Sequence, residues 1–233
     1  MGENNPIGNH ATRSYRLSVL ALAGMALLLC LYCLDGGIGM DEHECLVAEP
    51  AREMLESGDW MIPRFAGMVR LRKTPLPYWT VAAISAIGGE VTTWTARLPS
   101  ALSGAATVLV ICWLGSMLFG RRAGLVCGFV MATSLATLFY SHDAAADMQL
   151  TFWCSLCYAL FYRALVALRA EGGSNASASG QPCPGESGRP PAPARWWFYA
   201  FYAAFGAAML AKGPMPGPVV ALPLLVYLAI FLQ

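Results

Sequence analysis

Charged side chains are scarce in this sequence of 233 residues. They make up 12% of it, about half of the roughly 25% that is usual in a soluble domain. Several long segments contain none, which argues against an ordinary soluble globular domain. The formal net charge is +1, so the chain also lacks the basic excess typical of nucleic-acid-binding proteins. No Gly-rich loop of the nucleotide-binding kind and no internal repeat are present.

A disulfide framework is not indicated, although the chain has eight cysteines. Two pairs, Cys30/Cys33 and Cys154/Cys157, have the C-x-x-C spacing that also occurs in metal and redox sites. Both pairs lie inside apolar segments, as do Cys112 and Cys127. We therefore interpret the cysteines of these segments as small packing residues of membrane helices.

Long apolar runs are the main feature of the sequence. A helix needs about 20 apolar residues to span a bilayer. We expect spans at about 15–34, 98–119, 123–140, 148–168, 196–211 and 218–232. The sequence thus predicts an all-α integral membrane protein, a multi-span helical bundle. Its last apolar run stops with the sequence, which predicts that the chain is the truncated N-terminal part of a longer protein.

Flanking charges predict the orientation. Arg13 and Arg16 precede the first span, and acidic residues follow it, so residues 1–14 are predicted to be a cytoplasmic tail. Residues 35–97 then form an external loop, and residues 170–195, rich in Gly, Ser and Pro, form a disordered cytoplasmic linker. We expect a multi-pass protein of the cell's inner (plasma) membrane whose active face is external or periplasmic.

The external loop contains two segments with a helical pattern. In the first, Pro50 suits a first helical turn and Gly58 suits the C-terminal stop. One face of this segment is apolar, so we expect a helix lying on the membrane surface. The second segment, 75–87, is short for a span and is also expected to lie in the interface.

Ionisable residues from four segments are predicted to gather on the external side. Such residues cost about 2.5–3.5 kcal/mol each at membrane depth and usually have a role there. A carboxylate can accept a proton from an acceptor hydroxyl, and Lys or Arg can hold a phosphate leaving group. The alternative is that they are ordinary helix caps and interfacial charges. The residues are Asp41, Glu42, His43 and Glu44; Arg70, Arg72 and Lys73; His142, Asp143 and Asp147; and Lys212.

Several short motifs together resemble one family of membrane enzymes, the protein O-mannosyltransferase and aminoarabinose-transferase superfamily of the GT-C fold. The resemblance covers most of the chain apart from the N-terminal tail and the 170–195 linker. Its motifs are Asp41-Glu42, the segment from Ala51 to Trp60, Lys73-Thr74-Pro75-Leu76-Pro77-Tyr78-Trp79, Ala96-Arg97-Leu98-Pro99-Ser100, Asp147, and Lys212-Gly213-Pro214.

The resemblance implies transfer of a sugar from a polyprenyl-phosphate donor to a lipid or protein acceptor at the external face, with inversion at the sugar carbon. It implies that Asp41 is the catalytic base, assisted by Glu42 and Asp147, and that Lys73 holds the lipid phosphate. Arg72 stands where the family often has Glu. The substrate-binding set that we predict is Lys73, Arg72, Lys212, His142 and Asp143.

Three alternatives remain open. A divalent metal is the one cofactor considered, with His43 and Glu44 as weak candidate ligands beside His142 and neighbouring carboxylates. A membrane transporter would also have intramembrane charges and helices broken by Gly and Pro. A non-catalytic membrane fragment is the third.

Overall fold

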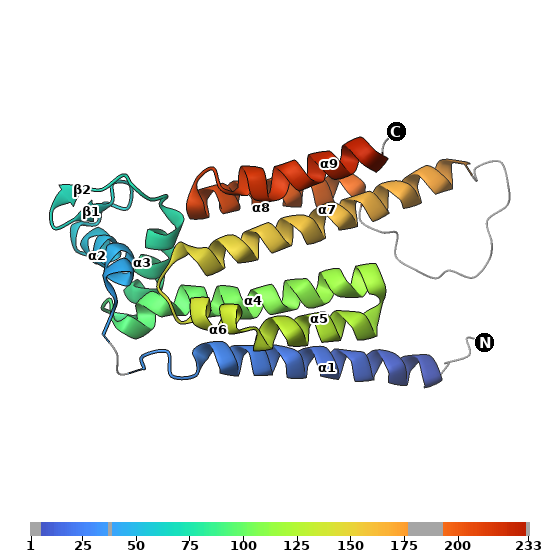
Figure 1. Ribbon diagram of the computed structural model, residues 1–233, viewed down its shortest axis with the longest axis horizontal. Coiled ribbons are helices and arrows are strands. Elements are labelled where there is room, and N and C mark those ends of the chain that lie inside the picture. Colours follow the sequence, from blue (N-terminus) through green and yellow to red (C-terminus); the bar gives the residue numbers. More distant parts are fainter. Residues whose placement is uncertain (1–5, 37–38, 177–192, 232–233) are drawn as a thin grey trace.

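The computed structural model describes residues 6–36, 39–176 and 193–231. Long helices run side by side in a bundle, and a smaller unit of two short helices and a hairpin lies at one end of it (Figure 1). The predicted all-α membrane fold is confirmed. Three helices of the described residues are long and apolar enough to cross a membrane, or four if one bent pair counts as a single span.

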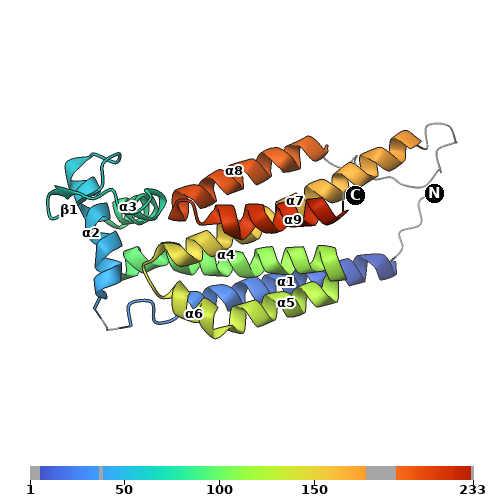
Figure 2. The same cartoon turned by 45° about the horizontal axis from the view of Figure 1, so that its top comes forward.

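Helix α4 (Thr93–Phe119) is the centre of the bundle. It contacts α1 (Pro6–Leu31) on one side and α7 (Ala146–Ala176) on the other. Figure 2 shows α8 (Ala194–Lys212) and α9 (Leu222–Phe231) on the α7 side, away from α1. The π-helical turn η1 (Gly217–Ala221) leads into α9. Whether α8 and α9 cross the membrane, as we predict for 196–211 and 218–232, stays a prediction.

Small residues allow α1, α4 and α5 (Arg121–Thr133) to approach closely. Without a hydrophobic driving force between helices in lipid, such close packing is what holds membrane helices together. Cys30 and Cys112 belong to this buried cluster, and Cys154 and Cys157 belong to another one between α7 and α8. The seven cysteines of the described residues are all free, as the packing interpretation requires.

The predicted single span over 123–140 is broken. Helix α5 ends at Thr133, and α6 (Leu135–Ser141) follows at an angle of 55°. Ser134 between them is extended, with φ −65° and ψ 129°. The Thr133 hydroxyl donates to the Phe129 carbonyl at 2.9 Å, a local bond of the kind that bends helices at their ends.

Two helices extend beyond the predicted spans. Helix α1 begins at Pro6, so part of the predicted cytoplasmic tail 1–14 is helical, as suits a proline at a first helical position. Helix α7 continues to Ala176, into the predicted linker. Residues 177–192 of that linker lie outside the described residues.

In the end unit, α2 (Glu42–Ser57) begins well before Pro50, which lies inside the helix rather than in its first turn. The Glu44 carboxylate accepts a hydrogen bond of 3.0 Å from the Asp41 N–H and thereby satisfies a donor at the helix start. The apolar face of α2 packs against α3 (Leu76–Gly88) and α4. Protein therefore covers this face, and the predicted position of the helix at the membrane surface stays a prediction.

A short hairpin joins α2 to α3 and was not predicted. Strand β1 (Arg64–Phe65) pairs antiparallel with β2 (Met68–Val69). Ala66 and Gly67 between them both have positive φ, 53° and 75°, which is what a tight primed turn requires. Strands of two residues are too short for an alternating pattern to reveal them.

A buried ion pair fixes the end unit to the bundle. Arg97 donates to both oxygens of Glu44, at 2.7 and 2.8 Å, and to the Leu34 carbonyl at 3.0 Å. Glu44 is 3% exposed and Arg97 is 8% exposed. The Ala144 N–H donates to the same carboxylate at 2.9 Å. One contact network thus connects the end of α1, the start of α2, the first turn of α4 and the loop before α7.

Removing one partner of this pair should be far more costly than removing an exposed charge. We expect Glu44→Gln to lower the free energy of unfolding by about 3–5 kcal/mol, because a buried Arg97 loses its counter-charge. The measurement is thermal unfolding of the purified protein in detergent. Glu49→Gln, which breaks an exposed pair with Arg52, is the matched control and should cost about 1 kcal/mol or less. Equal effects of the two changes would contradict a supporting role for Glu44.

Candidate functional site

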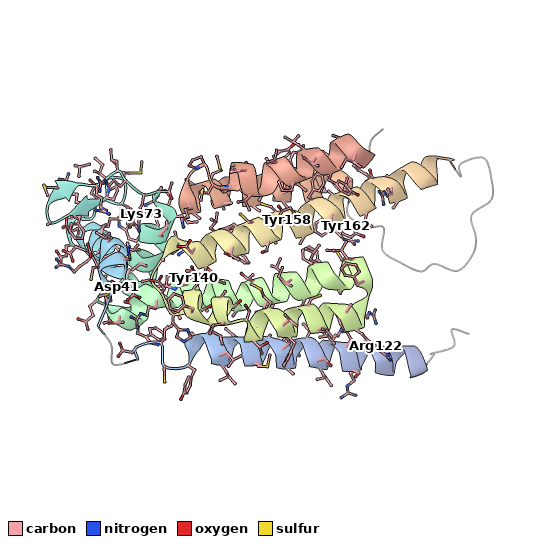
Figure 3. The ribbon with its side chains drawn as sticks, in the orientation of Figure 1. Asp41, Lys73, Arg122, Tyr140, Tyr158 and Tyr162 are labelled. Carbon is pink, nitrogen blue, oxygen red and sulfur yellow. The ribbon has the colours of Figure 1, made fainter. Side chains whose placement is uncertain are left out.

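The predicted site residues come from one end of the bundle. Figure 3 shows Asp41 and Lys73 at the end that carries α2 and α3, whereas Arg122 lies near the opposite end. Asp41 is the residue before α2, Lys73 lies in the loop before α3, and Asp147 is in the first turn of α7. Lys212, the last residue of α8, completes the set.

Carboxylates of two segments, 41–44 and 143–147, lie within electrostatic reach of one another. Burial raises the pKa of Asp143, and the neighbouring charges of Glu44, Asp147 and Asp41 raise it further, while Arg97 opposes the shift. Asp41 and Asp147 therefore both lie close enough to Asp143 for their charges to raise its pKa. Such a group of carboxylates holds a proton more readily than an isolated one.

Glu44, in contrast, is occupied by protein contacts. Burial opposes its ionisation, but the hydrogen bonds from Arg97 and from the N–H groups of Ala144 and Asp41 outweigh burial, so the pKa of Glu44 lies below its ordinary value. Its oxygens already accept four hydrogen bonds. This carboxylate is a structural acceptor with little capacity left for a ligand.

The metal hypothesis is not supported by the geometry. Within the part of the chain that the structure describes, no three His, Cys, Asp or Glu side chains come together in a way that could hold a metal ion. His43 is exposed, and Glu44 is bound to Arg97. The candidate role of these two residues as metal ligands stays a prediction without support from the described residues.

Cationic side chains lie beside the acidic region. Lys212 forms an ion pair with Asp147, joining the C-terminal end of α8 to the N-terminal end of α7. Partial burial lowers the pKa of Lys73, and the charges of Arg70 and Lys212 lower it too, whereas Asp147 and Asp143 act in the opposite direction. Two cations and two carboxylates thus influence one ammonium group.

His142 is held by backbone groups. Its Nδ1 lies 2.7 Å from the Leu138 carbonyl, and its Nε2 lies 2.8 Å from the Tyr32 carbonyl. The imidazole thereby ties the end of α6 to the end of α1. Its predicted role in binding a substrate stays a prediction, with both ring nitrogens already occupied.

The remaining predicted residues are exposed and available. Glu42 and Arg72 lie on the surface of the end unit. In the described residues, their side chains form no ion pair or hydrogen bond with the protein. The structure places them at the correct end of the molecule, and their predicted roles stay predictions.

Sequence reasoning missed the importance of Arg97. The signal was available, because this arginine directly precedes an apolar run that we predict to span the membrane. A charge in that position must find a partner or remain at the surface. Its partner, Glu44, lies 53 residues earlier in the chain, so no local pattern could identify the pair.

A family model described as dolichyl-phosphate-mannose-protein mannosyltransferase matches residues 72–170. Among curated proteins, the undecaprenyl phosphate-alpha-4-amino-4-deoxy-L-arabinose arabinosyl transferase 2 of Sodalis glossinidius is 31% identical over 127 residues, which are 54% of this chain and 23% of that protein. The corresponding transferase of Pectobacterium atrosepticum is 29% identical over 157 residues, which are 67% of this chain and 28% of that protein.

The fold is similar to solved structures as well. The crystal structure of ArnT from Cupriavidus metallidurans bound to undecaprenyl phosphate superposes with a TM-score of 0.71 at 27% identity, covering 91% of this chain and 35% of that one. The apo structure of the same protein gives the same TM-score at 25% identity, covering 96% of this chain and 37% of that one.

This chain spans about a quarter of the length of the curated relatives that it matches. The shared motifs, the matched family model and the shared helical bundle agree with the family resemblance of the sequence. In sequence and in helical fold, the chain is therefore similar to part of the GT-C membrane glycosyltransferases that include the protein mannosyltransferases and the aminoarabinose transferases.

Proposed function

We propose that this protein transfers a sugar from a polyprenyl-phosphate donor to a lipid or protein acceptor. One observation carries the proposal. The Asp147 carboxylate at the start of α7 is paired with Lys212 and acts on the charge of Lys73, and Asp41 before α2 acts on the neighbouring Asp143. A transferase of this kind needs a base for the acceptor and positive charge for the phosphate.

The proposed chemistry uses two groups on opposite sides of the sugar. The Asp41 carboxylate accepts the proton of the acceptor hydroxyl, and the acceptor oxygen forms a bond to the sugar carbon. The bond between that carbon and the phosphate oxygen breaks, so polyprenyl phosphate leaves with the bonding electrons and the configuration inverts. Lys73 and Lys212 stabilise the phosphate as it gains charge.

Polyprenyl phosphate as the donor carrier has two sources of support. One of the two solved structures with a similar fold is described as bound to undecaprenyl phosphate. The curated relatives are named as transferases that use an undecaprenyl-phosphate-linked aminoarabinose. We propose the same type of carrier lipid for this chain, but not the same sugar.

We further propose that the site end faces the outside of the inner membrane. Arg122 lies near the end opposite Asp41 and Lys73, and Arg121 is its neighbour in sequence (Figure 3). By the positive-inside rule, the end with these arginines faces the cytoplasm. A donor carried by a membrane lipid suits an external site, where nucleotide sugars are absent.

Loss of the proposed base should abolish turnover and spare the fold. We expect Asp41→Asn to reduce transfer by about 10²–10⁴-fold, because the amide cannot accept the acceptor's proton. The assay follows radiolabelled sugar from polyprenyl phosphate to membrane lipids and proteins. Glu90→Gln, at an exposed carboxylate between α3 and α4, is the control and should leave transfer unchanged. Undiminished transfer by Asp41→Asn would refute the assignment of the base.

Loss of the proposed phosphate contact should weaken binding of the donor. We expect Lys73→Gln to weaken donor binding by about tenfold or more, since a charge-assisted hydrogen bond to phosphate is lost. Lys73→Arg keeps the charge and should retain much of the affinity. The measurement is the dependence of the transfer rate on donor concentration. A donor KM that is the same for both variants and for the unchanged protein would argue against Lys73 as a phosphate ligand.

A further inference from the structure

Arg70 follows the hairpin, and its charge acts on Lys73 of the candidate site. Its backbone N–H donates to the Pro63 carbonyl at 2.8 Å, which closes the loop that carries β1 and β2. Its guanidinium lies over the ring of Phe65, 5.5 Å from the ring centre. The contact with an aromatic face holds the planar group in one orientation.

The guanidinium of Arg70 is only partly satisfied. Its Nε is buried and has no hydrogen-bond partner among the described residues. The guanidinium is a neighbour of the Tyr78 hydroxyl on α3: burial raises the pKa of that hydroxyl, and a hydrogen bond with Arg70 and the charge of Arg70 lower it. Buried polar atoms normally have partners, so the buried Nε of Arg70 indicates a polar ligand.

The charges of this region show which kind of ligand would fit. The charges of Arg70 and Lys212 both lower the pKa of Lys73, and the only carboxylate in an ion pair with any of the three, within the described residues, is Asp147 on Lys212. Two positive charges are therefore left without a direct counter-charge. The arrangement suits an anion, and a phosphate has both the oxygens and the charge to bind a guanidinium.

The amount of charge distinguishes the donor from the leaving group. A sugar linked to polyprenyl phosphate is a phosphodiester with about one negative charge, whereas the released phosphate monoester carries about two near neutral pH. Two unpaired cations match the released form better. A contact that strengthens as charge develops lowers the barrier more than it improves donor binding.

We propose that Arg70 is a second phosphate-binding residue, which acts with Lys73 to stabilise the charge that develops on the departing polyprenyl phosphate. The proposal rests on the proposed function and adds a residue that neither the family motifs nor the sequence assigned to the phosphate. Arg70 forms no covalent bond and transfers no proton.

The test measures binding of undecaprenyl phosphate to the purified protein in nanodiscs, together with the kinetics of transfer. We expect Arg70→Gln to weaken that binding by about tenfold or more and to lower kcat more than it raises the donor KM. Arg70→Lys keeps the charge but lacks the buried Nε and the planar fork, so it should bind about threefold or more weakly than the unchanged protein. Arg64→Gln removes a charge from β1 and is the matched control, with binding unchanged.

The outcomes separate the two proposals. If Lys73→Gln weakens binding and Arg70→Gln does not, the assignment of Arg70 is overturned while the proposed function stands. If the unchanged protein does not bind undecaprenyl phosphate, the proposed function itself is wrong. Thermal unfolding establishes that each variant is folded. Where Arg70→Gln does not fold, Arg70→Lys decides, and an affinity equal to that of the unchanged protein overturns the proposal.

Discussion

The buried ion pair of Glu44 and Arg97 is the constraint on which the rest of the site depends. One carboxylate accepts from Arg97 and from the N–H groups of Asp41 and Ala144. Through these bonds it fixes the start of α2 and the loop before α7 relative to α4. Those are the two places from which the acidic side chains of the site project. The geometry of the proposed active site is therefore set by residues that do not themselves contact a substrate.

A buried ion pair is a costly device, because two charges must leave water before they attract one another. Here the cost is offset by hydrogen bonding. Arg97 also donates to the carbonyl of Leu34, in the segment that directly follows α1. Four separate segments are connected in this way. The pair thus fixes how these segments are oriented at the end of the bundle. Packing of small residues between the long helices is less directional than hydrogen bonding and fixes this orientation less strictly.

Two opposite electrostatic environments lie side by side at this end. Asp143 is surrounded by carboxylates, and Lys73 lies among cations. The ion pair between Asp147 and Lys212 lies where the two regions meet. A reaction that needs a base for one substrate and positive charge for the other can use both regions at once.

The apolar runs were sufficient to predict the helical membrane fold, because the bilayer requires a helix of about 20 apolar residues wherever such a run occurs. The short motifs were sufficient for the family. The break at Ser134 was not predictable from hydropathy, since both halves of the run are apolar. The hairpin at Ala66 and Gly67 was missed because its strands have two residues each.

By itself, the sequence determined the membrane character, the approximate positions of the long helices, and the candidates Asp41, Lys73, Asp147 and Lys212. Each depends on local composition or on a short motif, and both are visible along the chain. Only the tertiary structure decided that Glu44 supports the fold, that the apolar face of α2 is covered by α3 and α4, and that Arg70 lies among the cations. The reason is physical: ion pairs and buried surfaces depend on distances between segments far apart in sequence, and a linear pattern contains no such distances.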